Sequence, residues 1–149
     1  PHAEHEKQIL HLARQEARGV FAENQQDFEP LTQQTLLTAR REVLDIHMAD
    51  SLEEYLLQLV LATRQPGAYG EDLAMWLQYG ASPRASIALD RCARARAWLD
   101  QRDFVGPDDI QNIAYDVLRH RLILSYEAEA EGITTDHFIK QLIARVAVP

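Results

Sequence analysis

Apolar residues recur along this chain mostly at intervals of three and four, the spacing of helices with one buried face. The clearest stripe predicts a helix over about 50–64 and consists of Leu52, Tyr55, Leu56, Leu59 and Val60. Asp50 with Glu53 three residues later has the spacing of a capping box, so we expect this helix to begin at Asp50.

The same spacing predicts helices along most of the remaining chain. We expect them over about 3–18, from a Thr32 cap through Leu44, over one or two turns ending at Gly80, over 82–101, over 107–121 and after a Thr134 cap. In the helix after Gly80, Ser82 should be the cap and Pro83 the first helical residue, where its missing N–H costs nothing.

Strand signals are weak throughout the sequence. Residues 122–126 lack a helical period and could be extended, but no segment alternates convincingly between apolar and polar positions. We therefore predict an all-α fold, a helical bundle with at most short β pieces. The polar run ENQQDFEP indicates a linker, which divides the chain into residues 1–30 and 31–149.

Composition describes a folded, acidic protein. The 149 residues are 46% apolar and 26% charged, with a formal net charge of −8, which excludes a disordered or collagen-like chain. The acid excess argues against nucleic acid or an anionic membrane as the main partner, and no apolar run is long enough for a membrane span. Thirteen of the 15 basic residues are arginines, and five of these lie within 84–102.

One cysteine, Cys92, permits no internal disulfide, which fits a reducing, cytoplasmic location. Its place among helical alanines favours a buried structural thiol. The sequence begins at Pro1 without an initiator methionine. We therefore expect it to be part of a longer protein.

Familiar catalytic patterns are missing. Neither Lys7 nor Lys140 follows a glycine, so there is no phosphate-binding P-loop. His2 and His5 have no third metal ligand nearby, so we predict no metal site. The chain by itself should have no complete active site and should not be catalytic alone.

The segment GASPRAS is the positive feature. A helix that starts Ser-Pro-Arg combines unpaired backbone amides and the positive end of the helix dipole with the Arg84 guanidinium, a combination suited to an anion. Alternatively, Arg84 is an ordinary solvated residue, at a position that costs a cation about 0.3–1 kcal/mol. The residues alone favour this second interpretation.

Several motifs in fixed order nevertheless resemble one family. The Gly-x-Ser-Pro-Arg helix start, the long alanine-rich helix, the Pro-Asp-Asp helix start, the Leu-Arg-His-Arg segment and the upstream run SLEEYLLQLVLATR resemble the C-terminal part of MoxR-family AAA+ ATPases. The likeness covers nearly the whole chain and is strongest over residues 50–149.

This resemblance implies the helical lid of an ATP-driven, chaperone-like motor that matures protein complexes. Residues 31–149 would be the lid and residues 1–30 the tail helix of the nucleotide-binding core plus a linker. By the same likeness Arg84 matches the sensor-2 arginine that reaches the γ-phosphate, Ser82 helps set that helix start, and Ile9 and Ala13 correspond loosely to adenine-pocket positions.

The resemblance also implies cofactors and partners. ATP and Mg²⁺ would bind the full-length protein, with none expected in this chain alone. The partners would be the protein's own core, neighbouring subunits in a ring, usually a hexamer, and proteins with a von Willebrand factor A domain.

The residues also allow other roles for the chain and for single segments. A stand-alone helical interaction module without a nucleotide role is the main alternative, and a helix-turn-helix using residues 108–121 is disfavoured by the acidic charge. Arg119, His120 and Arg121 could tie the last helices together or contact a subunit. The arginine-rich helix face could contact the core, a neighbouring subunit or solvent. The EAEAEG run is interpreted as a solvated edge, and Trp76 and Trp98 as packing residues.

Overall fold

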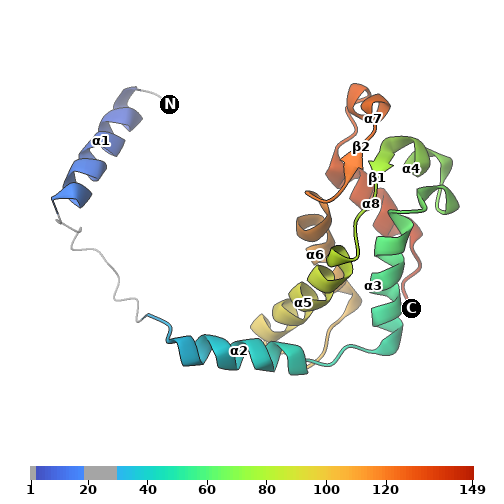
Figure 1. Cartoon of the computed structure of the whole chain (residues 1–149), viewed down its shortest axis with the longest axis horizontal. Helices are drawn as coiled ribbons and strands as arrows, with labels where there is room; N and C mark the ends of the chain where they lie inside the picture. Colours follow the sequence, from blue (N-terminus) through green and yellow to red (C-terminus); the bar gives the residue numbers. More distant parts are fainter. Residues whose placement is uncertain (1–2, 19–29) are drawn as a thin grey trace. The chain divides into compact units, whose positions relative to one another are not determined.

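The computed structural model describes residues 3–18 and 30–149, and the chain divides into two compact units, residues 1–35 and 36–149. Within the described residues the elements are α1 (Ala3–Ala17), α2 (Gln33–Asp45), α3 (Asp50–Ala62), the 3-10 helix η1 (Pro66–Ala68), α4 (Glu71–Trp76), β1 (Leu77–Tyr79), α5 (Arg84–Leu99), α6 (Pro107–Leu118), β2 (Ile123–Leu124), α7 (Tyr126–Ala130) and α8 (Thr135–Arg145) (Figure 1). The prediction of an all-α fold with short β pieces is confirmed. The predicted boundary at residue 30 falls at the end of 19–29, which lie outside the described residues, and stays a prediction.

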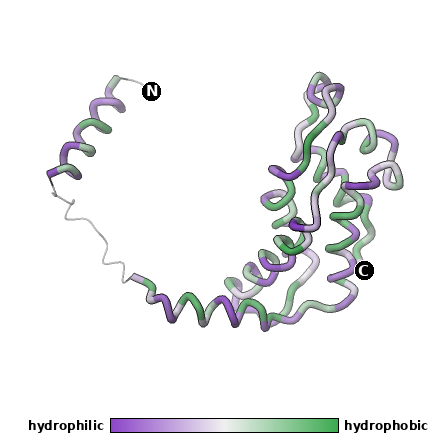
Figure 2. The backbone as a smooth tube through the Cα atoms, viewed as in Figure 1, coloured by the Kyte–Doolittle hydropathy of each residue, from purple (hydrophilic) through white to green (hydrophobic). Residues whose placement is uncertain are grey.

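The core of the second unit lies among α3, α5, α6 and α8. Leu59, Leu89, Ile110 and Phe138 are fully buried there. Figure 2 shows hydrophobic positions recurring between hydrophilic ones along the helices of this unit. Helix α5 contributes small residues, since Ala85, Ala93 and Ala97 have no exposed surface. Their small size lets α6 pack closely along α5.

A two-stranded antiparallel sheet joins segments that are distant in sequence. Leu77 of β1 pairs with Leu124 of β2, and Ser125 N–H donates to the Trp76 carbonyl at 2.9 Å. The extended piece predicted within 122–126 is confirmed for Ile123–Leu124. The prediction that these helical turns end at Gly80 was wrong. Helix α4 ends at Trp76 because Leu77–Tyr79 forms a strand, and its partner strand is distant in sequence and leaves no local pattern.

The structure confirms some of the helix caps predicted from the sequence. The hydroxyls of Thr32 and Thr134 each accept a backbone N–H three residues later, as predicted. The expected Asp50 cap is wrong, because Ala49 occupies the cap position and Asp50 is the first helical residue. There the carboxylate still lies at the positive end of the helix dipole, which is favourable without a capping bond.

Charged side chains connect the elements of the second unit. The Asp109 carboxylate accepts from Arg102 at 2.7 and 2.8 Å and from Gly106 N–H at 2.8 Å. Burial on its own raises the pKa of Asp109, but these donors and nearby Arg96 bring it below its usual value. This buried carboxylate therefore stays ionised and fixes the start of α6.

The remaining predictions concern single positions. Cys92 packs against the core as a partly buried thiol, so the predicted burial is only partial. Trp76 and Trp98 also pack against the core. The three glutamates of EAEAEG are exposed, as expected, although Ala128 between them is buried. Across residues 3–18 and 30–149, no helix has the length and apolar character required to cross a membrane.

Candidate functional site

The start of α5 brings together Ser82, Pro83 and Arg84, the segment singled out from the sequence. Pro83 has helical dihedral angles (φ −56°, ψ −20°) and occupies the cap position, and no side chain caps the helix. The prediction that Ser82 is the cap was therefore wrong. Its carbonyl oxygen accepts Ala85 N–H at 2.9 Å, while the Pro83 carbonyl accepts Ser86 N–H at 3.1 Å. The first turn is thus closed by main-chain carbonyls, and the serine hydroxyl is not needed.

Arg84 is the first residue of α5 and is exposed. Among the described residues its guanidinium has no hydrogen-bond or ion-pair partner. Two arginines further along the same helix differ in this respect: Arg94 donates to Asp90 at 2.8 Å, and Arg96 lies 3.5 Å from Asp109. Arg84 therefore presents a cation to its surroundings that no ion pair within its own unit neutralises.

The loop that precedes α5 is anchored to the end of α3. The buried Thr63 hydroxyl donates to the Val60 carbonyl at 2.6 Å and accepts Ala81 N–H at 2.9 Å. Arg64 Nε completes the connection by donating to the Ala81 carbonyl at 2.8 Å. Thr63 and Arg64, which end the run VLATR, hold both backbone polar groups of Ala81. We call this arrangement the Ala81 clamp.

Gly80 makes the clamp possible. A Cβ atom at residue 80 would lie 2.1 Å from the Thr63 carbonyl oxygen and 3.1 Å from Arg64 N. Only glycine lets the loop approach the α3 backbone this closely. Sequence reasoning treated Gly80 as a helix end; the contact that requires glycine is 17 residues away in sequence and could not be seen locally.

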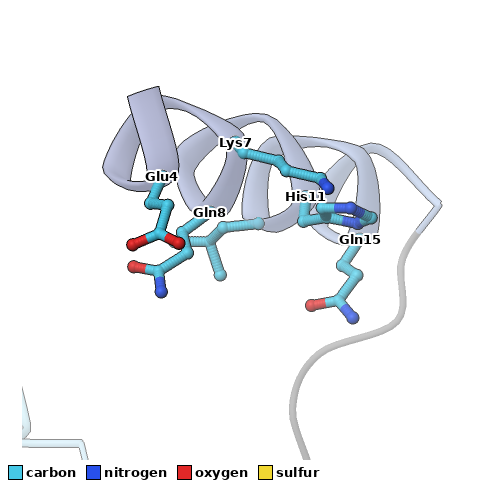
Figure 3. Close-up of a pocket in the computed structure, with 6 residues that line it drawn as sticks. Glu4, Lys7, Gln8, His11 and Gln15 are labelled. Atoms are coloured by element: carbon cyan, nitrogen blue, oxygen red, sulfur yellow. The ribbon is translucent and has the colours of Figure 1, made fainter. Parts of the chain in front are cut away.

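The two other predicted site residues, Ile9 and Ala13, lie on α1. This helix has no buried residue, and Ile9 is 61% exposed. One open depression follows α1, lined by Glu4, Lys7, Gln8, His11, Leu12 and Gln15 (Figure 3). All six lining residues come from one helix, and neither Ile9 nor Ala13 is among them. Ile9 and Ala13 belong to the first unit, whereas Ser82 and Arg84 belong to the second, and their role in an adenine site stays a prediction.

The Leu-Arg-His-Arg segment has a structural role. Arg119 donates to the Asp136 carboxylate at 2.6 and 3.2 Å, which ties the end of α6 to the first turn of α8. These bonds raise the pKa of Arg119 further above its normal range. The prediction that this segment ties the last helices together is thus confirmed for Arg119.

The described residues contain no group of three histidine, cysteine, aspartate or glutamate side chains placed to hold a metal ion. Of the two histidines considered in the sequence, His2 lies outside the described residues. The chemistry available at the start of α5 is therefore that of a guanidinium and a helix N-terminus, which suits an anion such as phosphate.

Comparison with known proteins identifies the region that contains this arginine. Residues 75–142 match the AAA lid domain family. The chain is 41% identical over 100 residues to the chaperone MoxR1 of Mycobacterium tuberculosis, covering 66% of this chain and 26% of that protein. It is 34% identical over 110 residues to the protein MoxR of Paracoccus denitrificans, covering 69% and 32% respectively. The chain carries an AAA lid domain and is a relative of the MoxR proteins.

Other matches extend this family assignment. YeaC of Bacillus subtilis is 38% identical over 119 residues, 80% of this chain and 35% of that protein. A crystal structure of a candidate ATPase from Cytophaga hutchinsonii superposes with a TM-score of 0.81 at 40% identity, covering 93% of this chain and 42% of the other. The chain thus spans roughly a quarter to two fifths of the proteins it matches.

Proposed function

We propose that this lid region senses bound nucleotide in a MoxR-type ATPase, with Arg84 contacting the γ-phosphate of ATP. The observation that carries the proposal is an exposed, unpaired arginine at the first residue of α5, inside the segment that matches the AAA lid. A cation is unfavourable at the positive end of a helix. A phosphate group between the guanidinium and the helix N-terminus reverses that cost, because both attract it.

The chain's own residues supply positioning and charge. The planar guanidinium of Arg84 can donate two parallel hydrogen bonds to phosphate oxygens, which a lysine cannot do. The Ala81 clamp holds the loop from which α5 starts, so Arg84 moves with the lid as one body. Ser82 stands beside it on the same exposed turn and contributes to the nucleotide-facing surface.

The described residues of this chain could supply only some of the contacts that bound ATP and Mg²⁺ need. Arg84 suits a terminal phosphate, but no cluster of oxygen ligands for Mg²⁺ occurs among the described residues. ATP and Mg²⁺ would therefore be held by other parts of the full-length protein, with Arg84 reaching in from the lid. Ile9 and Ala13 would line the adenine side of that site.

The wider assembly follows from the family. We propose that residues 1–30 are the tail helix of the nucleotide-binding core with a linker, and that residues 31–149 form the lid. The full-length protein would act in the cytoplasm as a ring, with a hexamer expected, and would remodel client proteins together with von Willebrand factor A-domain proteins. The lid matches do not favour a stand-alone helical interaction module.

Arg84→Ala in the full-length protein tests the proposal. We expect ATP turnover to fall about 100-fold, the scale of losing one donor to a transition-state oxyanion, with the fold unchanged by circular dichroism. Arg84→Lys should restore little of the loss, because it keeps the charge and removes the bidentate geometry. Lys140→Ala removes an exposed cation from α8 and serves as the matched control. Unchanged turnover in Arg84→Ala would remove the assignment.

A further inference from the structure

Residues of α2 and of the C-terminal half of α5 line a groove, away from the start of α5. Figure 1 shows these two helices. Its volume is about 520 Å³. It is lined by Leu36, Leu37, Ala39, Arg40, Arg41, Val43, Leu44, Arg91, Ala95, Trp98 and Leu99. We call this surface the α2–α5 groove.

The apolar part of the groove is open. Leu36 is 54% exposed, Leu44 59% and Leu99 72%, and α2 has no buried residue at all. A helix with leucines on its inner side and no covering neighbour leaves apolar area in water. Such a continuous exposed patch usually marks an interaction site.

The two walls of the groove are nevertheless held together. Trp98 Nε1 of α5 donates to the Glu42 carboxylate of α2 at 3.0 Å. The Arg94 guanidinium donates to the carbonyl of Ile46, just beyond the end of α2. The groove is therefore a formed surface whose walls are linked by specific hydrogen bonds.

Its charge is opposite to that of the chain as a whole. Arg40, Arg41 and Arg91 line the groove, and none of the three has a partner among the described residues, whereas no aspartate or glutamate lines it. The acids next to Arg41 and Arg91 in sequence have other partners: Glu42 accepts from Trp98, and Asp90 accepts from Arg94 at 2.8 Å. In a chain of net charge −8, three unneutralised arginines around leucines form a distinct recognition surface.

We propose that the α2–α5 groove binds an acidic amphipathic helix of a partner protein. A groove between two helices accepts a third helix through apolar anchors at i, i+3, i+4 and i+7. Leu37, Arg41 and Leu44 follow one another along α2 at helical spacing. A ligand helix with leucines flanked by glutamates would place its leucines against Leu37 and Leu44 and a glutamate against Arg41. The arginines provide charge-assisted bonds and select against basic partners. This inference does not depend on the nucleotide role of Arg84.

Peptide binding to the 149-residue chain provides the test. The probe is a fluorescein-labelled designed helix of about 18 residues, with leucines at i, i+3, i+4 and i+7 and glutamates beside them. A second peptide carries lysine at every glutamate position. Fluorescence anisotropy should show saturable binding of the acidic peptide, at least about tenfold tighter than the basic one and weakened by salt.

Charge-reversal variants locate the site. Arg40→Glu/Arg41→Glu/Arg91→Glu should weaken the acidic peptide by about tenfold or more and improve the basic one. Lys7→Glu/Arg14→Glu/Lys140→Glu changes the net charge equally at exposed basic residues outside the groove and should leave binding unchanged. Leu37→Ser/Leu99→Ser should also weaken binding, and both residues are exposed enough for the fold to tolerate the change, as circular dichroism will check.

Tryptophan fluorescence gives an independent readout. Binding of an unlabelled acidic peptide should change the emission of Trp98, so the change should vanish in Trp98→Phe and persist in Trp76→Phe. No binding, equal binding of the two peptides, or equal effects of the two triple variants would each overturn the proposal. Concentration-dependent dimers that only the groove variant abolishes would also overturn it, because the occupant would then be a second copy of the chain.

Discussion

Thr63 shows how one side chain can hold the loop that precedes Arg84. Its hydroxyl is the acceptor for Ala81 N–H and a donor to the Val60 carbonyl, and the residue is 1% exposed. In the sequence the Ala-Thr-Arg ending was visible only as a family motif. Its role in holding the loop before Arg84 became clear from the contact between residues 63 and 81.

Thr63→Val should therefore lower the free energy of unfolding by about 1–3 kcal/mol, because it leaves the Ala81 N–H buried without an acceptor. Chemical denaturation of the 149-residue chain measures this change. Thr63→Ser keeps the hydroxyl and is the control, with a smaller loss from the missing methyl group. Equal losses in the two variants would show that packing, and not the hydrogen bond, supports the loop.

At the scale of elements, an ion pair joins α4 to α8, two helices that are far apart in the sequence of the second unit. Arg145 donates to both oxygens of Asp72 at 2.6 Å and also to the Tyr69 carbonyl at 3.2 Å. These guanidinium hydrogen bonds lower the pKa of Asp72 from 3.8 to about 2. The short helix α4 is thereby fixed beside the C-terminal helix.

The stability contributed by this pair should depend on pH. Because the folded state lowers the pKa of Asp72 from 3.8 to about 2, the contribution is complete above 3.8 and is lost as the pH falls towards about 2. Asp72→Asn should be less stable than the parent chain at neutral pH, and the difference should shrink across that interval. Urea denaturation at several pH values measures it.

Asp116→Asn is the control for this pH series, since the Asp116 side chain is 74% exposed and its ion pair with Arg119 is 3.3 Å long. Its effect should be small at every pH. A difference between Asp72→Asn and the parent chain that stayed constant down to pH 2 would contradict the ion-pair explanation.

At the scale of the whole molecule, the second unit is a packed helical body with the exposed Arg84 at the start of α5. The described residues provide neither a phosphate-binding loop nor a metal-ligand cluster. Under the function proposed above, this unit contributes the charge of Arg84, and the remaining catalytic groups come from other parts of the full-length protein.

The 149-residue chain should accordingly release no phosphate from ATP with Mg²⁺ present, measured by a coupled phosphate assay. The full-length protein assayed beside it is the positive control. Turnover by the 149-residue chain that fell in its Arg84→Ala variant would contradict this view, because it would show that these residues complete an active site alone.

The sequence alone determined the helical class, most helix positions, the Thr32 and Thr134 caps and the presence of Arg84 at a helix start. These features depend on interactions within a few residues, which the spacing of apolar, capping and proline residues records. Only the tertiary structure decided that Leu77–Tyr79 is a strand, that Gly80 approaches the Thr63 carbonyl, and that α2 and α5 form an arginine-lined groove. Each of these depends on segments far apart in the chain, whose meeting is set by packing of the whole unit and leaves no local periodicity to read.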